Sequence, residues 1–363
     1  MKDVFYTNAR AEVTDPGKWY QPDLSAVKKL GKLIDESGIL DIFSKGDIVA
    51  VKAHFGDRGT TRTLRTVFIR AVVEKVIEAG GKPFVTETTG LGMLRARCTA
   101  VGRINIAEEN GYTPQTLKAP IIIADGLLGF DYIEVPVSGK HIRSVKVAKA
   151  IAESDAVICC THFKLHMQAG VGGSIKNVGV GCVAKPSKFD IHLSDYPRID
   201  QERCTRCDEC VRICPGNAIV DYQINRERCV KCLGCSEACR DDAVKTFWVF
   251  GRDVSERIVE CAKGVFEVQS NFAYLNFLLD ITPHCDCHPY SDIPVVPDLG
   301  IMASKDVVAI DRASVDLYRE AENLSGALLN HRKFWDWTDV EGMLDYAEEF
   351  GLGTRNYRLI DVS

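Results

Sequence analysis

Apolar runs and helical repeats alternate along the first part of the chain. Residues 47–54, DIVAVKAH, form a β-branched apolar run typical of a buried strand, and residues 62–79 carry apolar side chains at helical spacing. Gly80 and Gly81 end that helix, and KPFVTET at 82–88 begins another strand. Strand, helix and strand in this order predict a βαβ unit, and therefore a parallel, mostly buried sheet.

Further segments extend this pattern on both sides. Residues 25–42 have the spacing of an amphipathic helix, and APIIIAD (119–125) and SDAVICCTH (154–162) are short apolar runs of strand length. After residue 247, FAYLNFLLDIT (272–282) resembles a strand, and helices are expected from about Asp311 and from Val340. The predicted fold class is α/β, with a mostly parallel sheet.

A cysteine-rich segment interrupts the α/β pattern between about Pro197 and Lys245. We interpret it as a small α+β insert within one larger domain, so that residues 1–195 and 247–363 form the two parts of the α/β domain and residues 196–246 the insert. The alternative is three domains in series. A length of 363 residues is compatible with both, at about 150 residues per domain.

Composition narrows the class of protein. The net charge of −5 gives no excess of Lys and Arg to neutralise phosphates, so a nucleic-acid partner is not expected. No stretch approaches the 18 or so uncharged apolar residues of a membrane span, and the first twenty residues lack the apolar core of a secretion signal. We therefore expect a cytoplasmic protein, in which the 15 cysteines bind metal rather than form disulfides.

Eight of the cysteines form an internal repeat. CTRCDECVRICPGNAI at 204 recurs as CVKCLGCSEACRDDAV at 229, and each copy has the spacing Cys-x2-Cys-x2-Cys-x3-Cys of bacterial ferredoxins, whose fourth cysteine ligates the other cluster. Zinc is the weaker alternative, because its sites usually use two separated Cys-x2-Cys pairs. Two [4Fe-4S] clusters are expected, one on Cys204, Cys207, Cys210 and Cys239, and one on Cys229, Cys232, Cys235 and Cys214.

These residues also carry a family resemblance. The cysteine segment resembles the dicluster bacterial ferredoxins over about fifty residues. The remainder resembles the uncharacterised iron-sulfur center proteins built on domain of unknown function 362, notably in KAHFGDRGTTRTLR (52–65), THFKLHMQAGVGGSIKNVGVGC (161–182) and IPVVPDLGIMASKDVVAIDRASVDL (293–317). The resemblance implies an α/β domain interrupted by a ferredoxin insert, but no reaction. Met167 and Gln168 stand where such proteins often carry Glu-Met.

Three polar residues alternate with apolar residues from the end of the apolar run at 154–162 onward. His162, Lys164 and His166 alternate with apolar residues, so on an extended backbone they share one face at the carboxyl end of a strand, where ligands bind in parallel sheets. A metal ion or an anion is the expected occupant. The alternative is that all three bond to nearby backbone or carboxylates.

A glycine-rich segment comes next. Gly172, Gly173, Ser174 and Lys176 precede or begin a helix, where free backbone N–H groups and a lysine favour a phosphate or carboxylate. The segment is neither a Walker A sequence nor a dinucleotide fingerprint. A tight packing turn is the alternative.

His54 and Glu87 end two neighbouring strands of the predicted sheet and are expected to face one crevice. Either could instead be a satisfied structural residue.

The sequence His284-Cys285-Asp286-Cys287-His288 is a second concentration of soft ligands. Cys285 and Cys287 on an extended chain would place both sulfurs on one side for a metal, with flanking histidines, or would act as redox-active thiols. Packing beside the clusters or substrate is the alternative. The other five cysteines have apolar or small neighbours and are expected in the core.

The favoured function is an iron-sulfur oxidoreductase that passes electrons between an external carrier protein and a small-molecule substrate or metal site near His162, Lys164 and His166. The alternatives are a non-redox metal- or anion-binding enzyme with structural clusters, and a protein that delivers electrons or iron to a partner. Two intact cluster motifs favour electron transfer, because a structural role would need only one. The oligomeric state is not predicted.

Overall fold

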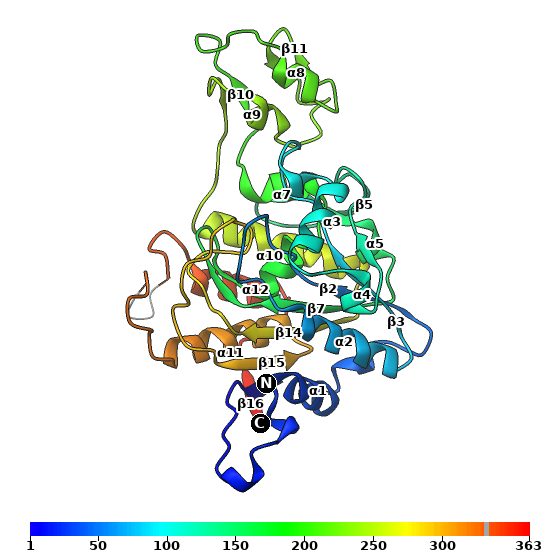
Figure 1. Ribbon diagram of the computed structural model, residues 1–363. Coiled ribbons are helices and arrows are strands. Elements are labelled where there is room, and N and C mark those ends of the chain that lie inside the picture. Colours follow the sequence, from blue (N-terminus) through cyan, green and yellow to red (C-terminus); the bar gives the residue numbers. More distant parts are fainter. Residues whose placement is uncertain (330–333) are drawn as a thin grey trace.

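A computed structural model describes residues 1–329 and 334–363 and contains a central sheet of eight strands (Figure 1). The strand order is β16-β1-β15-β14-β7-β2-β3-β4. The bounds are β1 Lys2–Asn8, β2 Ile48–Lys52, β3 Lys82–Glu87, β4 Ile121–Ile123, β7 Ala156–His162, β14 Phe272–Leu278, β15 Gly300–Ser304 and β16 Tyr357–Asp361.

The sheet is mostly parallel. Strands β14, β7, β2, β3 and β4 form an unbroken parallel set, with Ala50 opposite Val157 and Val51 opposite Val85. Strand β15 runs antiparallel to both of its neighbours, and β1 and β16 pair in parallel at the far edge. The expected α/β class with a mostly parallel sheet is therefore confirmed. Strands from before residue 195 and after residue 247 belong to the same sheet.

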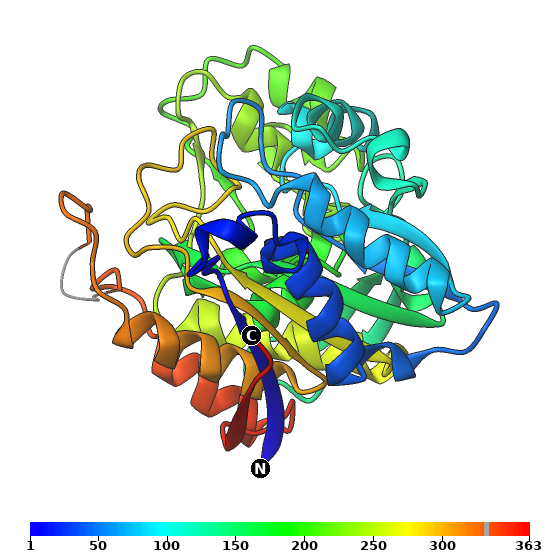
Figure 2. The same cartoon turned by 60° about the horizontal axis from the view of Figure 1, so that its bottom comes forward.

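Helices cover both faces of this sheet (Figure 2). On one face lie α1 Ala26–Ser37 and α2 Thr66–Glu78, with α4 Pro114–Leu117 packed against α2. On the other face lie α6 Ser174–Gly179 and α11 Val307–Glu320, followed outward by α10 Arg252–Val268 and α12 Val340–Glu349. Two separate apolar cores result, one on each side of the sheet, as expected when a parallel sheet is buried on both faces.

The remaining elements surround the carboxyl edge of the sheet. They are α3 Ala100–Glu109, α5 Lys149–Ala152, α7 Lys185–His192, the hairpin β5 Tyr132–Pro136 with β6 Ser144–Ala148, and the hairpin β8 Lys164–His166 with β9 Gly170–Gly172. Short 3-10 turns occupy Pro16–Lys18, Pro22–Leu24, Ile39–Ile42 and Ala96–Cys98. None of the helices in the described chain has both the length and the hydropathy to cross a membrane.

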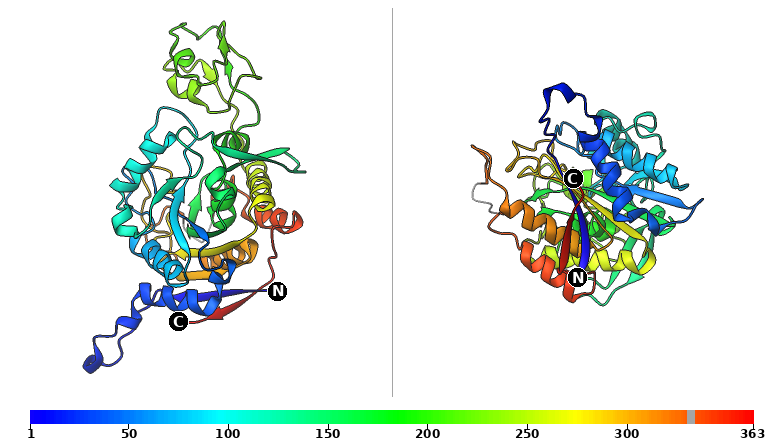
Figure 3. Two further views of the ribbon diagram at one scale, coloured as in Figure 1. Left: turned by 90° about the vertical axis from the view of Figure 1, so that its right-hand side faces the viewer. Right: turned by 90° about the horizontal axis from the view of Figure 1, so that it is seen from below.

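The cysteine-rich segment stands out from the α/β body (Figures 1 and 3). It contains α8 Glu209–Ile213, α9 Gly234–Ala238 and two small antiparallel pairs, β10 Arg198–Ile199 with β13 Val244–Lys245 and β11 Ile219–Val220 with β12 Gln223–Ile224. Left-handed residues recur at a spacing of 25: Arg206 and Lys231 have φ of 57° and 58°, and Asp208 and Leu233 have φ of 63° and 67°. The two copies of the sequence repeat thus adopt one backbone conformation.

Some boundaries differ from those expected. Residues 25–42 are not one helix: α1 ends at Ser37 because Gly38 adopts φ 61°, and a 3-10 turn follows. Helix α11 starts at Val307 rather than Asp311, because the Asp306 carboxylate accepts hydrogen bonds from the N–H groups of Val308 and Ala309.

Candidate functional site

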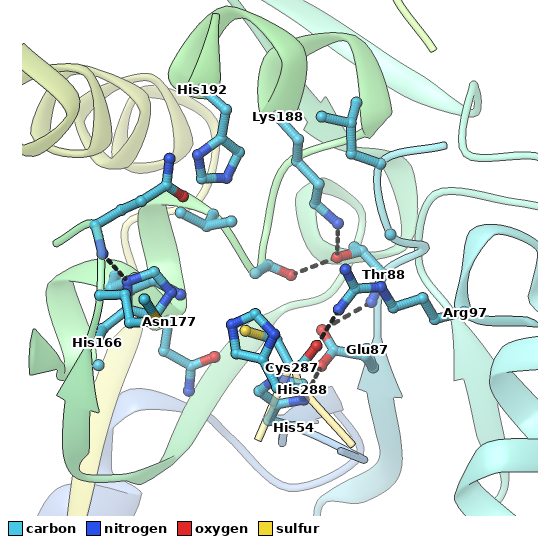
Figure 4. A pocket seen from close by; sticks show the side chains of 18 of the residues that line it. His54, Glu87, Thr88, Arg97, His166, Asn177, Lys188, His192, Cys287 and His288 are labelled. Atoms are coloured by element: carbon cyan, nitrogen blue, oxygen red, sulfur yellow. Dashed lines mark hydrogen bonds and ion pairs between the residues drawn. The ribbon is translucent and has the colours of Figure 1, made fainter. Parts of the chain in front are cut away.

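The parallel strands end at a cavity of about 640 Å³. His54 follows β2, Glu87 ends β3 and His162 ends β7, and all three line it. Figure 4 shows His54, Glu87, His166 and Cys287 facing this common space. This is the crevice expected at the carboxyl ends of parallel strands, and it contains most of the side chains singled out from the sequence.

Glu87 is the centre of a buried ion cluster on one wall. Its carboxylate lies 2.9 Å from Lys52 Nζ, 3.0 Å from Arg103 Nη2 and 3.2 Å from His54 Nδ1, and its side chain is 5% exposed. Burial alone would raise the pKa of Glu87, but the positive charges of Lys52 and Arg103 outweigh it and hold the pKa well below its ordinary value. Glu87 is therefore ionised and acts as a fixed counter-charge.

Asp286 organises the opposite wall. Its Oδ2 lies 2.9 Å from His162 Nδ1 and 3.1 Å from Lys164 Nζ, and all three residues are buried. Burial would raise the pKa of Asp286, but His162 and Lys164 lower it below its ordinary value. Nε2 of His162 lies 2.8 Å from the Leu279 carbonyl oxygen. These bonds fix the orientation of His162 and Lys164 at the cavity.

The glycine-rich segment is occupied by a carboxylate of the chain itself. Asp311 accepts hydrogen bonds from the N–H groups of Ser174 (2.7 Å) and Ile175 (2.8 Å) at the start of α6. The Ser174 hydroxyl donates to Asn276 Oδ1 at 2.7 Å, and Ser174 does not line the cavity. The N-terminus of α6 therefore binds Asp311, whereas Gly172, Gly173 and Lys176 remain on the cavity wall.

His166, Cys285 and Cys287 come together beside the cavity, which His166 and Cys287 line. A ring nitrogen of His166 and both sulfurs lie within 4.8 Å of one another. Nδ1 of His166 accepts hydrogen bonds from the N–H groups of Gln168 and Ala169, both at 3.1 Å, and burial lowers the pKa of His166 to about 4. His166 is thus a neutral imidazole with its proton on Nε2.

Cys287 is the less buried member of this pair. It lines the cavity, whereas Cys285 lies behind it at 1% exposure. A hydrogen bond with Cys285 lowers the pKa of Cys287 to about 6, with further lowering by Lys176 and Arg97 that outweighs the effect of burial. Cys287 is therefore mainly a thiolate at neutral pH.

The sequence analysis missed the contribution of α7. Lys188 and His192 lie four residues apart on this helix, which places them on one face, and both line the cavity. Lys188 Nζ donates to the Thr88 hydroxyl at 2.6 Å, and burial lowers its pKa to about 8. The spacing in KPSKFDIH was the signal that could have identified them.

The cavity is strongly cationic. Among the residues described, one carboxylate lines it, Glu87, against seven basic side chains, namely Lys52, Arg95, Arg97, Arg103, Lys164, Lys176 and Lys188. Lys176 makes no hydrogen bond or ion pair within residues 1–329 and 334–363, and Nδ1 of His192 is buried without a partner there. Trp248, Phe250 and Trp337 supply apolar wall. The arrangement suits an anion with an apolar or planar part.

The eight repeat cysteines fall into two groups. Cys204, Cys207, Cys210 and Cys239 line one small cavity, which we call the outer set. Cys229, Cys232 and Cys235 interact electrostatically with Cys214, and we call these four the inner set. The N–H groups of Ala218 and Ala243 each donate to a sulfur at 3.3 Å, on Cys214 and Cys239 respectively, as equivalent members of the repeat.

The separation of these sulfurs tests which metal group they fit. A tetrahedral zinc ion would hold its sulfurs about 3.8 Å apart. In the described part of the chain, two groups of three His, Cys, Asp or Glu side chains bring their ligand atoms within 4.8 Å of one another, and neither contains a cysteine of the inner or outer set. Four thiols around a wider space fit a bulky iron-sulfur cubane better than a single ion.

The inner set adjoins the large cavity. Leu233, the residue between Cys232 and Gly234, lines the cavity. Its backbone is in the left-handed region. The Cys232 carbonyl oxygen accepts a hydrogen bond from Gly92 N–H at 2.8 Å, and the Glu237 carboxylate accepts from the N–H groups of Met93 (2.6 Å) and Leu94 (2.9 Å). In Figure 1, α9 accordingly lies nearer to the α/β body than β11.

The other five cysteines are buried as expected: Cys98, Cys159, Cys160, Cys182 and Cys261. The second group with ligand atoms within 4.8 Å is His141, Asp253 and Glu256. Glu256 there is already paired with Lys140 at 2.8 Å, so that group is an ion-pair network.

The chain is similar to several known proteins. A segment of the thylakoid-associated protein sll1697 from Synechocystis sp. strain PCC 6803 is 31% identical over 175 residues, which are 47% of this chain and 50% of that protein. The chain thus spans about half the length of this curated relative.

Two solved structures are similar at low identity. One is the lactate racemase apoprotein from Thermoanaerobacterium thermosaccharolyticum (11% identity, TM-score 0.37, 69% of this chain and 49% of that chain), and the other is a structural-genomics protein from Thermotoga maritima (10%, 0.44, 81% and 57%). The family model described as domain of unknown function DUF362 matches residues 49–316, which is well over half of the chain. The chain therefore belongs to the DUF362 family.

Proposed function

We propose that the chain is an iron-sulfur oxidoreductase with two [4Fe-4S] clusters. Residues 196–246 would form a ferredoxin-type insert between the two parts of the α/β domain, 1–195 and 247–363. The outer set would ligate one cluster and the inner set the other. Support comes from the repeated spacing, from the shared backbone of the two copies, and from sulfurs too widely spaced for a single zinc ion.

The observation that best supports a redox function is that the inner set adjoins the large cavity. Leu233, the neighbour of ligand Cys232 in sequence, lines the cavity, so electrons on the inner cluster would have a short path to a bound molecule. Cys207 of the outer set is exposed, whereas Cys232 is buried. An external carrier protein would therefore exchange electrons at the outer cluster, and the inner cluster would serve the cavity.

The proposed substrate is a small anion. Lys164 and Lys176 would bind its charged group beside Gly172 and Gly173, and His54, His162 and His166 face the space where it would react. Glu87 and Asp286 keep the neighbouring cations charged and in place. What the clusters would supply is single electrons at low potential; binding, orientation and proton supply fall to these side chains.

Redox titration of anaerobically purified protein, followed by EPR, tests this proposal. Two clusters that reduce at accessible potentials, with a midpoint that shifts when an anion binds in the cavity, are expected. Clusters that resist reduction would favour the alternative, a non-redox metal- or anion-binding enzyme with structural clusters. Reducible clusters indifferent to every anion, in a protein that reduces a partner, would favour electron or iron delivery instead.

A further inference from the structure

Cys285 and Cys287 lie close enough to each other to form a disulfide bond. Both lie in a turn closed by a hydrogen bond from His288 N–H to the Cys285 carbonyl oxygen at 3.0 Å. The N–H of Cys287 points at the Cys285 sulfur at 3.4 Å, and the two sulfurs lie within 4.8 Å of each other. Residues two apart in a turn satisfy the Cα separation that a disulfide requires.

The surroundings of the pair disfavour a metal ion. Nδ1 of His166 already accepts two backbone hydrogen bonds, and the ring proton is therefore on Nε2, so neither nitrogen has a free lone pair for a metal. Lys164, Lys176 and Arg97 all act on Cys287 as positive charges. Such a field opposes binding of a dication and favours a thiolate.

We propose that Cys285 and Cys287 form a reversible dithiol–disulfide couple that stores two electrons at the cavity. This proposal rests on the proposed function, because the one-electron partners are the two clusters. Because Cys287 is a thiolate, oxidation breaks the S–H bond of Cys285, forms one S–S bond and releases one proton and two electrons, one electron to each oxidised cluster. Reduction reverses this, with one electron from each reduced cluster and one proton from water in the cavity.

The cysteine pair lies beside the same cavity as the inner cluster set, and this location indicates what the couple could do. Cys287 and Leu233 line the same cavity, so the dithiol and the inner cluster set face one bound molecule. Clusters of this type exchange single electrons, whereas most reductions of organic anions need two. A disulfide takes up two electrons and can deliver them as a pair. The cysteine couple would thus link the one-electron transfers of the clusters to a two-electron reduction without a further cofactor.

Electron counting tests the couple without any assay of activity. Anaerobic holoprotein, first oxidised with diamide, is titrated with dithionite while the visible absorbance of the clusters is followed. The wild-type protein should take up about four electrons per chain, two in the clusters and two in the disulfide, and the Cys287→Ser protein about two. Cys261→Ala, which removes a buried thiol that does not line the cavity, should behave as wild type.

Differential alkylation and peptide mass spectrometry locate the bond. The oxidised peptide should be two hydrogens lighter and unlabelled at both cysteines, and dithiothreitol should restore both labels. The couple is refuted if the wild-type protein takes up only about two electrons and both thiols stay labelled while the clusters are intact. It is also refuted if one bound zinc per chain protects the pair. Visible cluster absorbance that does not change during the titration, whatever the number of electrons taken up, would instead contradict the cluster assignment, which separates the two failures.

Discussion

Replacement of Glu87 by Gln should strongly destabilise the α/β domain. The carboxylate is 2.9 Å from Lys52 and 3.0 Å from Arg103, and the three side chains are 5%, 1% and 6% exposed. Gln keeps the volume but removes the charge, so two buried cations lose their counter-charge in a region of low dielectric. Breaking a buried ion pair from one side costs about 3–5 kcal/mol. We expect a loss of that size in the free energy of unfolding.

Urea denaturation under anaerobic conditions, monitored by tryptophan fluorescence, measures this loss. Glu134→Gln is the matched control, because Glu134 is 52% exposed and pairs with Lys146 at the same 2.9 Å. An exposed pair contributes about 0–1 kcal/mol, so the control should scarcely change. If Glu87→Gln lost no more stability than Glu134→Gln, Glu87 would not be the buried counter-charge described above.

Four further predictions concern the cluster sets and the cavity. Cys239→Ser and Cys214→Ser should each lower the iron content to about four per chain, and full retention in either would contradict the crossed ligand assignment. Glu237→Ala should leave the iron content unchanged but abolish the anion-induced shift of the cluster midpoint, because it removes the bonds that join α9 to Met93, Leu94 and the cavity-lining Arg95. Lys176→Gln should weaken inorganic phosphate binding about tenfold by calorimetry, and unchanged affinity would place the anion elsewhere. From pH 6.5 to 5 the lowered pKa of His166, about 4, should contribute a stability loss of about 1.6 kcal/mol, because the folded state binds fewer protons than the unfolded state. The lowered pKa of His192, about 3, adds a similar loss, so His166→Gln should reduce the slope in urea titrations by about half.

Much of the α/β domain could be predicted from hydrophobic patterning. The runs at 47–54 and 154–162 are continuous and β-branched, and such runs form the centre of parallel sheets, as β2 and β7 do. Helix α10 was not predicted, because its strip of buried residues includes Glu256 and Glu260, whose partners come from distant segments. The edge strands β1 and β16 pair with each other from opposite ends of the chain, which local patterns do not reveal.

The cavity was predicted in part. Side chains at the ends of β2, β3 and β7 converge because parallel strands end at one edge, so His54, Glu87 and His162 could be placed together. The anion site expected at the start of α6 differs, because Asp311 reaches it from 137 residues away in sequence. The contact of Leu233 with the cavity depends on how the insert sits on the α/β body, and no spacing in the sequence encodes that placement.

The iron and acid-labile sulfide content of the anaerobically purified chain tests the central claim most directly. The account predicts about eight iron and eight sulfide per chain, with an EPR spectrum of two interacting clusters after reduction. About four iron, or zinc in place of iron, would contradict it.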